Sequence, residues 1–139
     1  MSNRTFTIIK PDSVRKGNFG KIISRLESDG FRVLGVKKVA LAQRQAEAFY
    51  AVHRERPFFG NLVEYMTSGP VYVAALERDN AVPHLRQLMG ATDPTKADAG
   101  TIRKEFGESI EQNAIHGSDS NENAAIEIAF FFAESDLVS

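Results

Sequence analysis

Strand-like runs alternate with helical patterns along this chain, and that order limits the possible fold more than any other feature of the sequence. The strand-like runs are residues 5–9, 31–41 and 71–76. The first is β-branched and aromatic, as strands usually are. The third is apolar without interruption, and such a run is typical of a strand buried on both faces. We therefore expect it in the middle of a sheet.

Helical patterns separate these runs. Apolar residues recur at helical spacing in residues 19–26, 46–53, 62–66, 81–89 and from residue 120 onward. The order strand–helix–strand–helix–helix–strand–helix–loop–strand–helix predicts an α+β fold with a four-stranded, mostly antiparallel sheet. The natural topology is the ferredoxin-like split βαβ arrangement, with helices covering the sheet. The length of 139 residues predicts a single domain spanning residues 1–139.

The last helix carries a carboxylate at the edge of its apolar face. Asp119 or Ser120 is expected to cap its first turn. Its inner face is expected to contain Ala124, Ala125, Ile128, Phe131 and Phe132. Glu127 lies at the inner edge of that stripe, where a carboxylate needs a partner. The nearest candidate that could fold back onto it is His116.

Composition and charge exclude several classes of protein. The net charge is -1 and the isoelectric point is about 6.3, which argues against a dedicated nucleic-acid binder. There is no cysteine, so disulfides, zinc–thiolate sites and thiol catalysis are excluded. The N-terminus lacks the layout of a signal peptide, and no apolar stretch approaches the roughly 20 residues needed to span a bilayer. We expect a cytoplasmic protein.

Residues 113–120, with the sequence N-A-I-H-G-S-D-S, contain the strongest candidate for chemistry. An imidazole placed where a strand gives way to a loop is held from behind and open to a ligand in front. This position suggests that His116 is a nucleophile. A lone histidine is more commonly a hydrogen-bonded structural residue, and its position alone does not decide between the two roles.

Three familiar catalytic motifs are absent. The glycines at 17 and 20 with Lys21 resemble a phosphate-binding loop, but Arg15 replaces the first glycine of that motif and Ile22 its hydroxyl residue. The acidic residues and histidines match no zinc or two-metal spacing, so we expect no metal held by the protein alone. A serine hydrolase is excluded because no G-x-S-x-G elbow occurs.

What remains is a set of cations and polar groups that suit phosphate. Its members are Lys10, Tyr50, Arg86, Thr92, Arg103 and Asn113. Guanidinium and ammonium groups form short, strong hydrogen bonds with phosphate oxygens. An unperturbed imidazole is largely neutral at pH 7 and could attack phosphorus, giving a covalent phosphohistidine. The pattern alone does not show that these residues converge.

The turn at residues 54–60 contributes two adjacent aromatic residues, Phe58 and Phe59. One ring is expected to complete the core while the other faces outward. An exposed ring is a candidate stacking platform.

With these residues in view, the chain resembles the nucleoside diphosphate kinase family. Residues 113–120 are similar to the active-site signature of that family. The opening T-F-T-I-I-K-P-D at residues 5–12, R-P-F-F at 56–59, S-G-P at 68–70 and G-T-I-R at 100–103 recur there in the same order. The resemblance covers nearly the whole chain.

This resemblance implies a reaction and a set of phosphate contacts. His116 would take the terminal phosphate of a nucleoside triphosphate, mainly ATP, through Nδ1 and pass it to a nucleoside diphosphate in a ping-pong reaction. Lys10 and Asn113 would contact the ribose hydroxyls, with Lys10 also near the transferred phosphate. The β- and γ-phosphates would be held by Arg86, Thr92 and Arg103.

The resemblance also assigns the remaining positions. Tyr50 would lie beside the reacting phosphate and the imidazole. Phe58 would stack on the base, with Ile110 on its other face, and stacking without base-edge hydrogen bonds implies broad base specificity. Glu127 would hydrogen-bond the imidazole, and Ser118 would support that carboxylate.

Cofactor and assembly follow from the same resemblance. Mg²⁺ is expected on the nucleotide phosphates and not on a dedicated protein site. Family members form tetramers or hexamers built from dimers, so we expect a homo-oligomer. Ser13 and Ala99 depart from residues common in relatives, and the former is expected to alter only a turn.

Two other functions stay open on the sequence alone. The first is a non-catalytic ferredoxin-like module that binds nucleotides or RNA, although the aromatic RNA-binding signature is missing. The second is a scaffold that keeps the fold without the activity.

Overall fold

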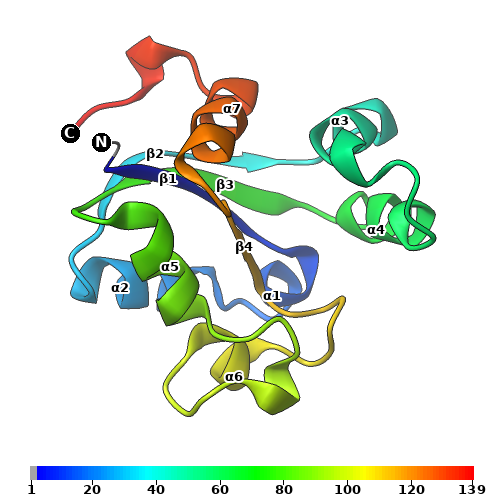
Figure 1. Cartoon of the computed structure of the whole chain (residues 1–139), viewed down its shortest axis with the longest axis horizontal. Coiled ribbons are helices and arrows are strands. Elements are labelled where there is room, and N and C mark those ends of the chain that lie inside the picture. Colours follow the sequence, from blue (N-terminus) through cyan, green and yellow to red (C-terminus); the bar gives the residue numbers. More distant parts are fainter. Residues whose placement is uncertain (1–2) are drawn as a thin grey trace.

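The computed structural model describes residues 3–139 and contains one four-stranded antiparallel sheet (Figure 1). The strands are β1 (Arg4–Ile9), β2 (Arg32–Val39), β3 (Val71–Glu77) and β4 (Ile115–Gly117). Their order in the sheet is β2-β3-β1-β4. The predicted α+β fold with an antiparallel, ferredoxin-like sheet is confirmed, and β3 lies in the interior of the sheet as its apolar run predicted.

Helices fill the connections between the strands. The α-helices are α1 (Pro11–Arg15), α2 (Phe19–Ser28), α3 (Gln43–Phe49), α4 (Phe59–Met66), α5 (Ala81–Met89), α6 (Ile102–Phe106) and α7 (Asn121–Phe131). Three short 3₁₀ helices cover Ala51–His53, Pro94–Lys96 and Glu134–Asp136. Helices α2 and α5 lie on one side of the sheet and α7 on the other, while α3 and α4 stand together at one end (Figure 1).

Strand β1 lies in the interior of the sheet, between β3 and the shortest strand, β4. It pairs with β3 over its full length and with β4 through three residue pairs. In the β4 pairing, His116 lies opposite Ile8, and the Thr7 hydroxyl donates to the His116 carbonyl at 2.7 Å. These contacts fix the backbone of His116 against the most buried strand of the protein.

Alternating side chains of the sheet feed two hydrophobic cores. On one face, Phe6, Ile8 and Val73 pack with residues of α7 and α4. On the other face, Ile9 and Leu76 pack with the apolar stripes of α2 and α5. Side chains of consecutive strand residues point to opposite faces, so β1 serves both cores.

The structure corrects the prediction for the segment after β1. Pro11 was expected only to end the strand, yet it occupies the first position of helix α1. A proline fits there because the first turn of a helix has no use for its missing N–H. Ser13, expected in a turn, is a buried residue of this helix.

Helix α7 also differs in one detail from the prediction. Ser120 caps it, accepting a hydrogen bond from Asn123 N at 3.0 Å, as expected. Ala124 and Ile128 are buried, but Ala125 is exposed. The helix is apolar on most of its circumference, so helical spacing did not distinguish the face that meets the sheet.

The turn before α4 divides its aromatic residues as expected. Phe58 is 48% exposed, whereas Phe59 packs against the core around β1.

No helix within residues 3–139 has both the length and the apolar character needed to cross a membrane.

The close packing of β4 against α5 gives a test of this fold. A Cβ atom at Gly117 would lie 2.6 Å from Met89 Sδ and 3.0 Å from Leu85 Cδ2, both in the buried core. Gly117→Ala is therefore expected to lower the free energy of unfolding by about 1–3 kcal/mol, as overpacked core substitutions do. Urea unfolding monitored by circular dichroism measures this.

Gly20→Ala is the matched control. A Cβ at Gly20 in α2 would meet no atom within 4 Å, and alanine is favoured over glycine in a helix by roughly 0.5–1 kcal/mol. Equal unfolding free energies for the two variants would contradict the packing of β4 on α5.

Candidate active site

A cavity of about 860 Å³ opens between α3, the start of α4, α5, the loop after α5, β4 and α7. Its lining includes almost every site residue predicted from the sequence: Lys10, Tyr50, Phe58, Arg86, Thr92, Arg103, Ile110, Asn113, His116 and Glu127. Ser118 lies behind this lining and is fully buried. The convergence that the sequence pattern could not establish is therefore present.

The imidazole of His116 is oriented by a carboxylate. Its Nε2 lies 3.0 Å from Glu127 Oε1, and the same oxygen accepts a hydrogen bond from the Ser118 hydroxyl at 2.7 Å. A carboxylate is only an acceptor, so we assign the hydrogen of the neutral ring to Nε2. Nδ1 then keeps a lone pair, and about a fifth of the side chain is solvent-exposed.

Aromatic rings surround the other edges of this imidazole. Phe6, Phe49 and Tyr50 present their rings at 6.2, 5.7 and 6.4 Å from the His116 centroid, all close to edge-on. Burial raises the pKa of Tyr50, and the charge of Glu127 raises it further. The Tyr50 hydroxyl is therefore a proton donor at neutral pH.

Lys10 reaches the cavity from the end of β1. Its Nζ donates to Asn113 Oδ1 at 2.7 Å, and Asn113 Nδ2 in turn donates to the Thr92 carbonyl at 3.0 Å. Burial lowers the pKa of Lys10 to about 8, and the charge of Arg103 contributes in the same direction. This lysine is thus a buried cation whose charge the protein itself offsets only in part.

Two arginines complete the positive lining. Arg103, from α6, is 8% exposed and donates to the carbonyls of Ile115 at 2.8 Å and Gly90 at 3.2 Å. Burial, followed by the charge of Arg86, lowers its pKa to about 10. Arg86, on the outer side of α5, donates to the Gly117 carbonyl at 3.3 Å. Arg103 and Lys10 are buried cations whose pKa values are lowered by burial and by a neighbouring positive charge, and such a site favours the binding of an anion.

One part of the cavity mouth is apolar. Phe58 and Ile110 both line it and are 48% and 62% exposed. Leu62 of α4 lies beside them in the lining. Charges inside and apolar side chains at the rim suit a ligand with an anionic end and a flat, apolar end.

Several polar residues around this cavity were not predicted as site residues from the sequence. Asp119 and Asn123 line it, with Asn123 Nδ2 donating to Asp119 Oδ1 at 2.6 Å. That hydrogen bond is the main cause of the lowered pKa of Asp119. The spacing of Asp119 from His116 could have indicated it. Asp12 was not predicted either, because no pattern in its neighbourhood indicates that this acid is buried.

Asp12 is 1% exposed and makes three hydrogen bonds with two groups behind the cavity. Its Oδ2 accepts from Ala114 N at 3.1 Å, its Oδ1 accepts from the Tyr65 hydroxyl, and its own N–H donates to that hydroxyl at 3.0 Å. The Tyr65 pKa is raised by burial and by the hydrogen bond that its hydroxyl donates to the Asp12 carboxylate.

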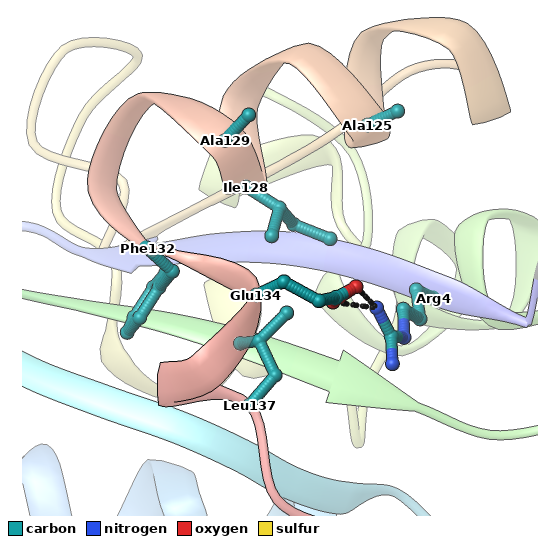
Figure 2. Close-up of a pocket in the computed structure, with 7 residues that line it drawn as sticks. All are labelled: Arg4, Ala125, Ile128, Ala129, Phe132, Glu134 and Leu137. Carbon is teal, nitrogen blue, oxygen red and sulfur yellow. Dashed lines mark hydrogen bonds and ion pairs between the residues drawn. The ribbon is translucent and has the colours of Figure 1, made fainter.

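A second cavity, of about 340 Å³, lies between α7 and the C-terminal segment (Figure 2). Its lining is mostly aliphatic, and Arg4 Nη1 and the Glu134 carboxylate pair across it at 3.1 and 3.2 Å. It lacks any candidate nucleophile, so the larger cavity is the candidate active site. Within residues 3–139, no three or more acidic or histidine side chains are grouped so as to hold a metal ion.

Comparison with known proteins identifies the family. The model of the nucleoside diphosphate kinase family matches residues 3–137. The chain is 62% identical to a nucleoside diphosphate kinase of Granulibacter bethesdensis, covering 98% of this chain and 97% of that protein. It is 58% identical to one of Sulfurimonas denitrificans, covering 96% and 98% of the two chains.

Two solved structures share the fold over the whole chain. One is the Aquifex aeolicus nucleoside diphosphate kinase, with a TM-score of 0.96 at 43% identity, covering 99% and 100% of the two chains. The other is a halophilic nucleoside diphosphate kinase from Halobacterium salinarum in complex with CDP, with a TM-score of 0.95 at 42% identity, covering 100% and 93%. The chain therefore belongs to the nucleoside diphosphate kinase family, whose members are phosphotransferases that move phosphate between nucleotides.

Proposed function

We propose that this protein transfers the terminal phosphate of a nucleoside triphosphate to a nucleoside diphosphate by a ping-pong mechanism through a phosphohistidine on His116. The observation that supports this most strongly is the orientation of the imidazole. Glu127 binds Nε2 from behind, which leaves the Nδ1 lone pair for the cavity that contains Lys10, Arg86 and Arg103. A nucleophile next to three cations suits attack on a polyphosphate.

In the first half-reaction, Nδ1 of His116 attacks the γ-phosphorus. The bond between that phosphorus and the β–γ bridging oxygen breaks, and the nucleoside diphosphate leaves with the bonding electrons. The ring becomes positively charged as the N–P bond forms, and Glu127 stabilises that charge through Nε2–H. The second half-reaction is the reverse transfer, to the terminal oxygen of another nucleoside diphosphate.

The remaining side chains divide between charge stabilisation and orientation. Arg86, Thr92 and Arg103 would hold the β- and γ-phosphates, while Lys10 and Asn113 would bind the ribose hydroxyls. Tyr50 would donate to the reacting phosphate, since its raised pKa keeps its hydroxyl protonated. Ser118 supports the carboxylate of Glu127.

The base is expected at the apolar mouth, stacked between Phe58 and Ile110. Because every base has a π-face, stacking there gives broad base specificity. The structural relative that holds CDP supports a nucleotide in this cavity. Mg²⁺ would enter as part of the substrate, bound to the phosphates, where it neutralises charge. The cavity supplies cations suited to the phosphate oxygens.

Three further expectations accompany this function. We propose that residues 1–139 form a single domain, that the protein is cytoplasmic, and that it is a homo-oligomer, a tetramer or hexamer built from dimers. A mass measurement in solution tests the last of these.

A labelling experiment tests the phosphohistidine. Protein incubated with γ-labelled ATP is expected to acquire acid-labile, alkali-stable label at a stoichiometry near one. His116→Ala should abolish it. His84→Gln, a change of a histidine outside the cavity lining, should not. Label that persists in His116→Ala would reject the assignment.

The same experiment separates the alternative functions. A protein that binds nucleotides but shows neither label nor ADP–GTP exchange would be a non-catalytic binding module. A protein that neither binds nucleotides nor acquires label would be a scaffold.

The labelled enzyme also tests base specificity. Chasing it with ADP, GDP, CDP or UDP is expected to release the label at rates within about tenfold of one another, because stacking discriminates weakly between bases. Rapid-quench measurements at equal subsaturating concentrations give the four rates. Release by one base alone would contradict the proposed stacking mode.

The lowered pKa of Lys10 predicts a pH dependence. The kcat/KM for ATP is expected to fall as the pH rises through about 8, because Lys10 of the nucleotide-free enzyme loses its proton there. The phosphates of ATP stay ionised over this range, so the fall reports the enzyme and not the substrate. Lys10→Gln should have lower activity and lack this fall. Lys21→Gln, a change of an exposed lysine in α2, should keep the wild-type profile.

Unfolding does not explain such a fall. Between about pH 8 and 10.5 the unfolded chain binds the Lys10 proton more readily than the folded chain. The contribution of this group to folding stability therefore improves as the pH rises through that window. An identical pH profile in Lys10→Gln and in the wild type would contradict the role of Lys10.

A further inference from the structure

Two residues before His116, the backbone of Ala114 takes a conformation that is rare for alanine. Its φ is 75°, and the residue is completely buried. Ile115 N donates to Asn113 O at 2.9 Å, which closes a three-residue turn centred on Ala114. Turns of this kind with positive φ are rare and strained. This one connects Asn113, which binds the Lys10 ammonium, to the strand of His116.

Both backbone polar groups of Ala114 are held by the segment that follows β1. The Ala114 carbonyl accepts from Lys10 N at 2.9 Å. The Ala114 N–H donates to Asp12 Oδ2 at 3.1 Å. A strained backbone persists only where its surroundings enforce it, and the Asp12 carboxylate binds the backbone of Ala114, the strained residue itself.

Asp12 is itself fixed by helix α4. The Tyr65 hydroxyl donates to Asp12 Oδ1 and accepts from Asp12 N at 3.0 Å. Both residues are buried, at 1% and 7% exposure. Because α4 also carries Leu62 in the cavity wall, one carboxylate connects the segment after β1, the α4 wall and the turn before β4.

Asp12 and Tyr65 lie outside the cavity lining, so neither is placed to touch a nucleotide. We propose that Asp12 is a positioning residue that acts through Ala114. By holding the strained turn, it fixes Asn113 and His116 in one geometry before the nucleotide arrives. This inference rests on the proposed function, in which His116 accepts the phosphate.

Substitution of the strained residue distinguishes positioning from ordinary structural support. Glycine adopts positive φ as readily as negative φ. Ala114→Gly therefore removes the penalty that Asp12 opposes. If Asp12 acts by holding this turn, its substitution should cost less in the Ala114→Gly background. If Asp12 only stabilises the fold, the two effects should be independent.

The experiment is a double-mutant cycle of Asp12→Asn and Ala114→Gly, with Asp79→Asn as the control for loss of an exposed carboxylate. Single-turnover labelling of His116 by saturating MgATP gives the transfer rate, and calorimetry gives the affinity for ADP. Asp12→Asn is expected to slow transfer about 10- to 100-fold, the effect of a misplaced reacting group, with ADP affinity changed less than about threefold. The double variant should recover at least about fivefold of that loss.

Three results would overturn the inference: transfer by Asp12→Asn within threefold of the wild type, a loss confined to ADP affinity, or independent effects in the cycle.

If Asp12→Asn does not fold, Tyr65→Phe tests the same role. It keeps the Asp12 carboxylate but removes the hydroxyl that binds it. It is expected to slow transfer about three- to tenfold, again with ADP affinity unchanged, and an unchanged transfer rate in folded Tyr65→Phe would reject the role. A wild-type protein that acquires no label would reject the proposed function instead.

Discussion

The antiparallel pairing of β4 with β1 is the interaction on which the site depends. Strand β4 has only three residues, too few to be stable without a partner. Its partner is buried from Thr5 to Ile9 and is held on its other flank by β3. The pairing sets His116 opposite Ile8 and leaves Lys10 at the end of the same strand. The proposed nucleophile and a cation 106 positions apart in the chain thereby reach one cavity.

The positive charges at this site are balanced only in part by groups of the protein itself. Arg103 and Lys10 are buried, and the charges of Arg86 and Arg103 lower the pKa values of their neighbours. Carbonyl and amide oxygens of the chain accept their hydrogen bonds, but these dipoles offset a full charge only in part. Phosphate oxygens would supply the missing negative charge. In the proposed function, phosphate binding would therefore relieve the repulsion among these cations.

The sequence predicted most of the fold from local patterns. The uninterrupted apolar run of β3, the cap at Ser120 and the outward ring of Phe58 each follow from a few neighbouring residues, and each is present. Helix α1 was not predicted because its five residues are too few to show a helical pattern of apolar residues. Ala125 was wrongly predicted to be buried because α7 is apolar on most sides. For the site, the placement of Glu127 at the edge of a buried stripe correctly pointed to His116 as its partner. The convergence of Arg86, Arg103 and Lys10 did not follow from periodicity, since it is created by strand pairing and loop closure over long separations.

Asp12 shows why the remaining features escape local patterns. A buried carboxylate is unfavourable unless its oxygens accept hydrogen bonds, and here the donors come from Tyr65 and Ala114, 53 and 102 positions away. Neither contact leaves a periodic trace in the sequence. The same holds for the positive φ of Ala114, a residue that by itself prefers ordinary helical or extended conformations. The cavity thus combines an interior fixed by long-range hydrogen bonds with an exposed apolar mouth at Phe58 and Ile110. In the proposed function, the rigid interior would place the reacting groups, and a mouth that offers only stacking would accept any base.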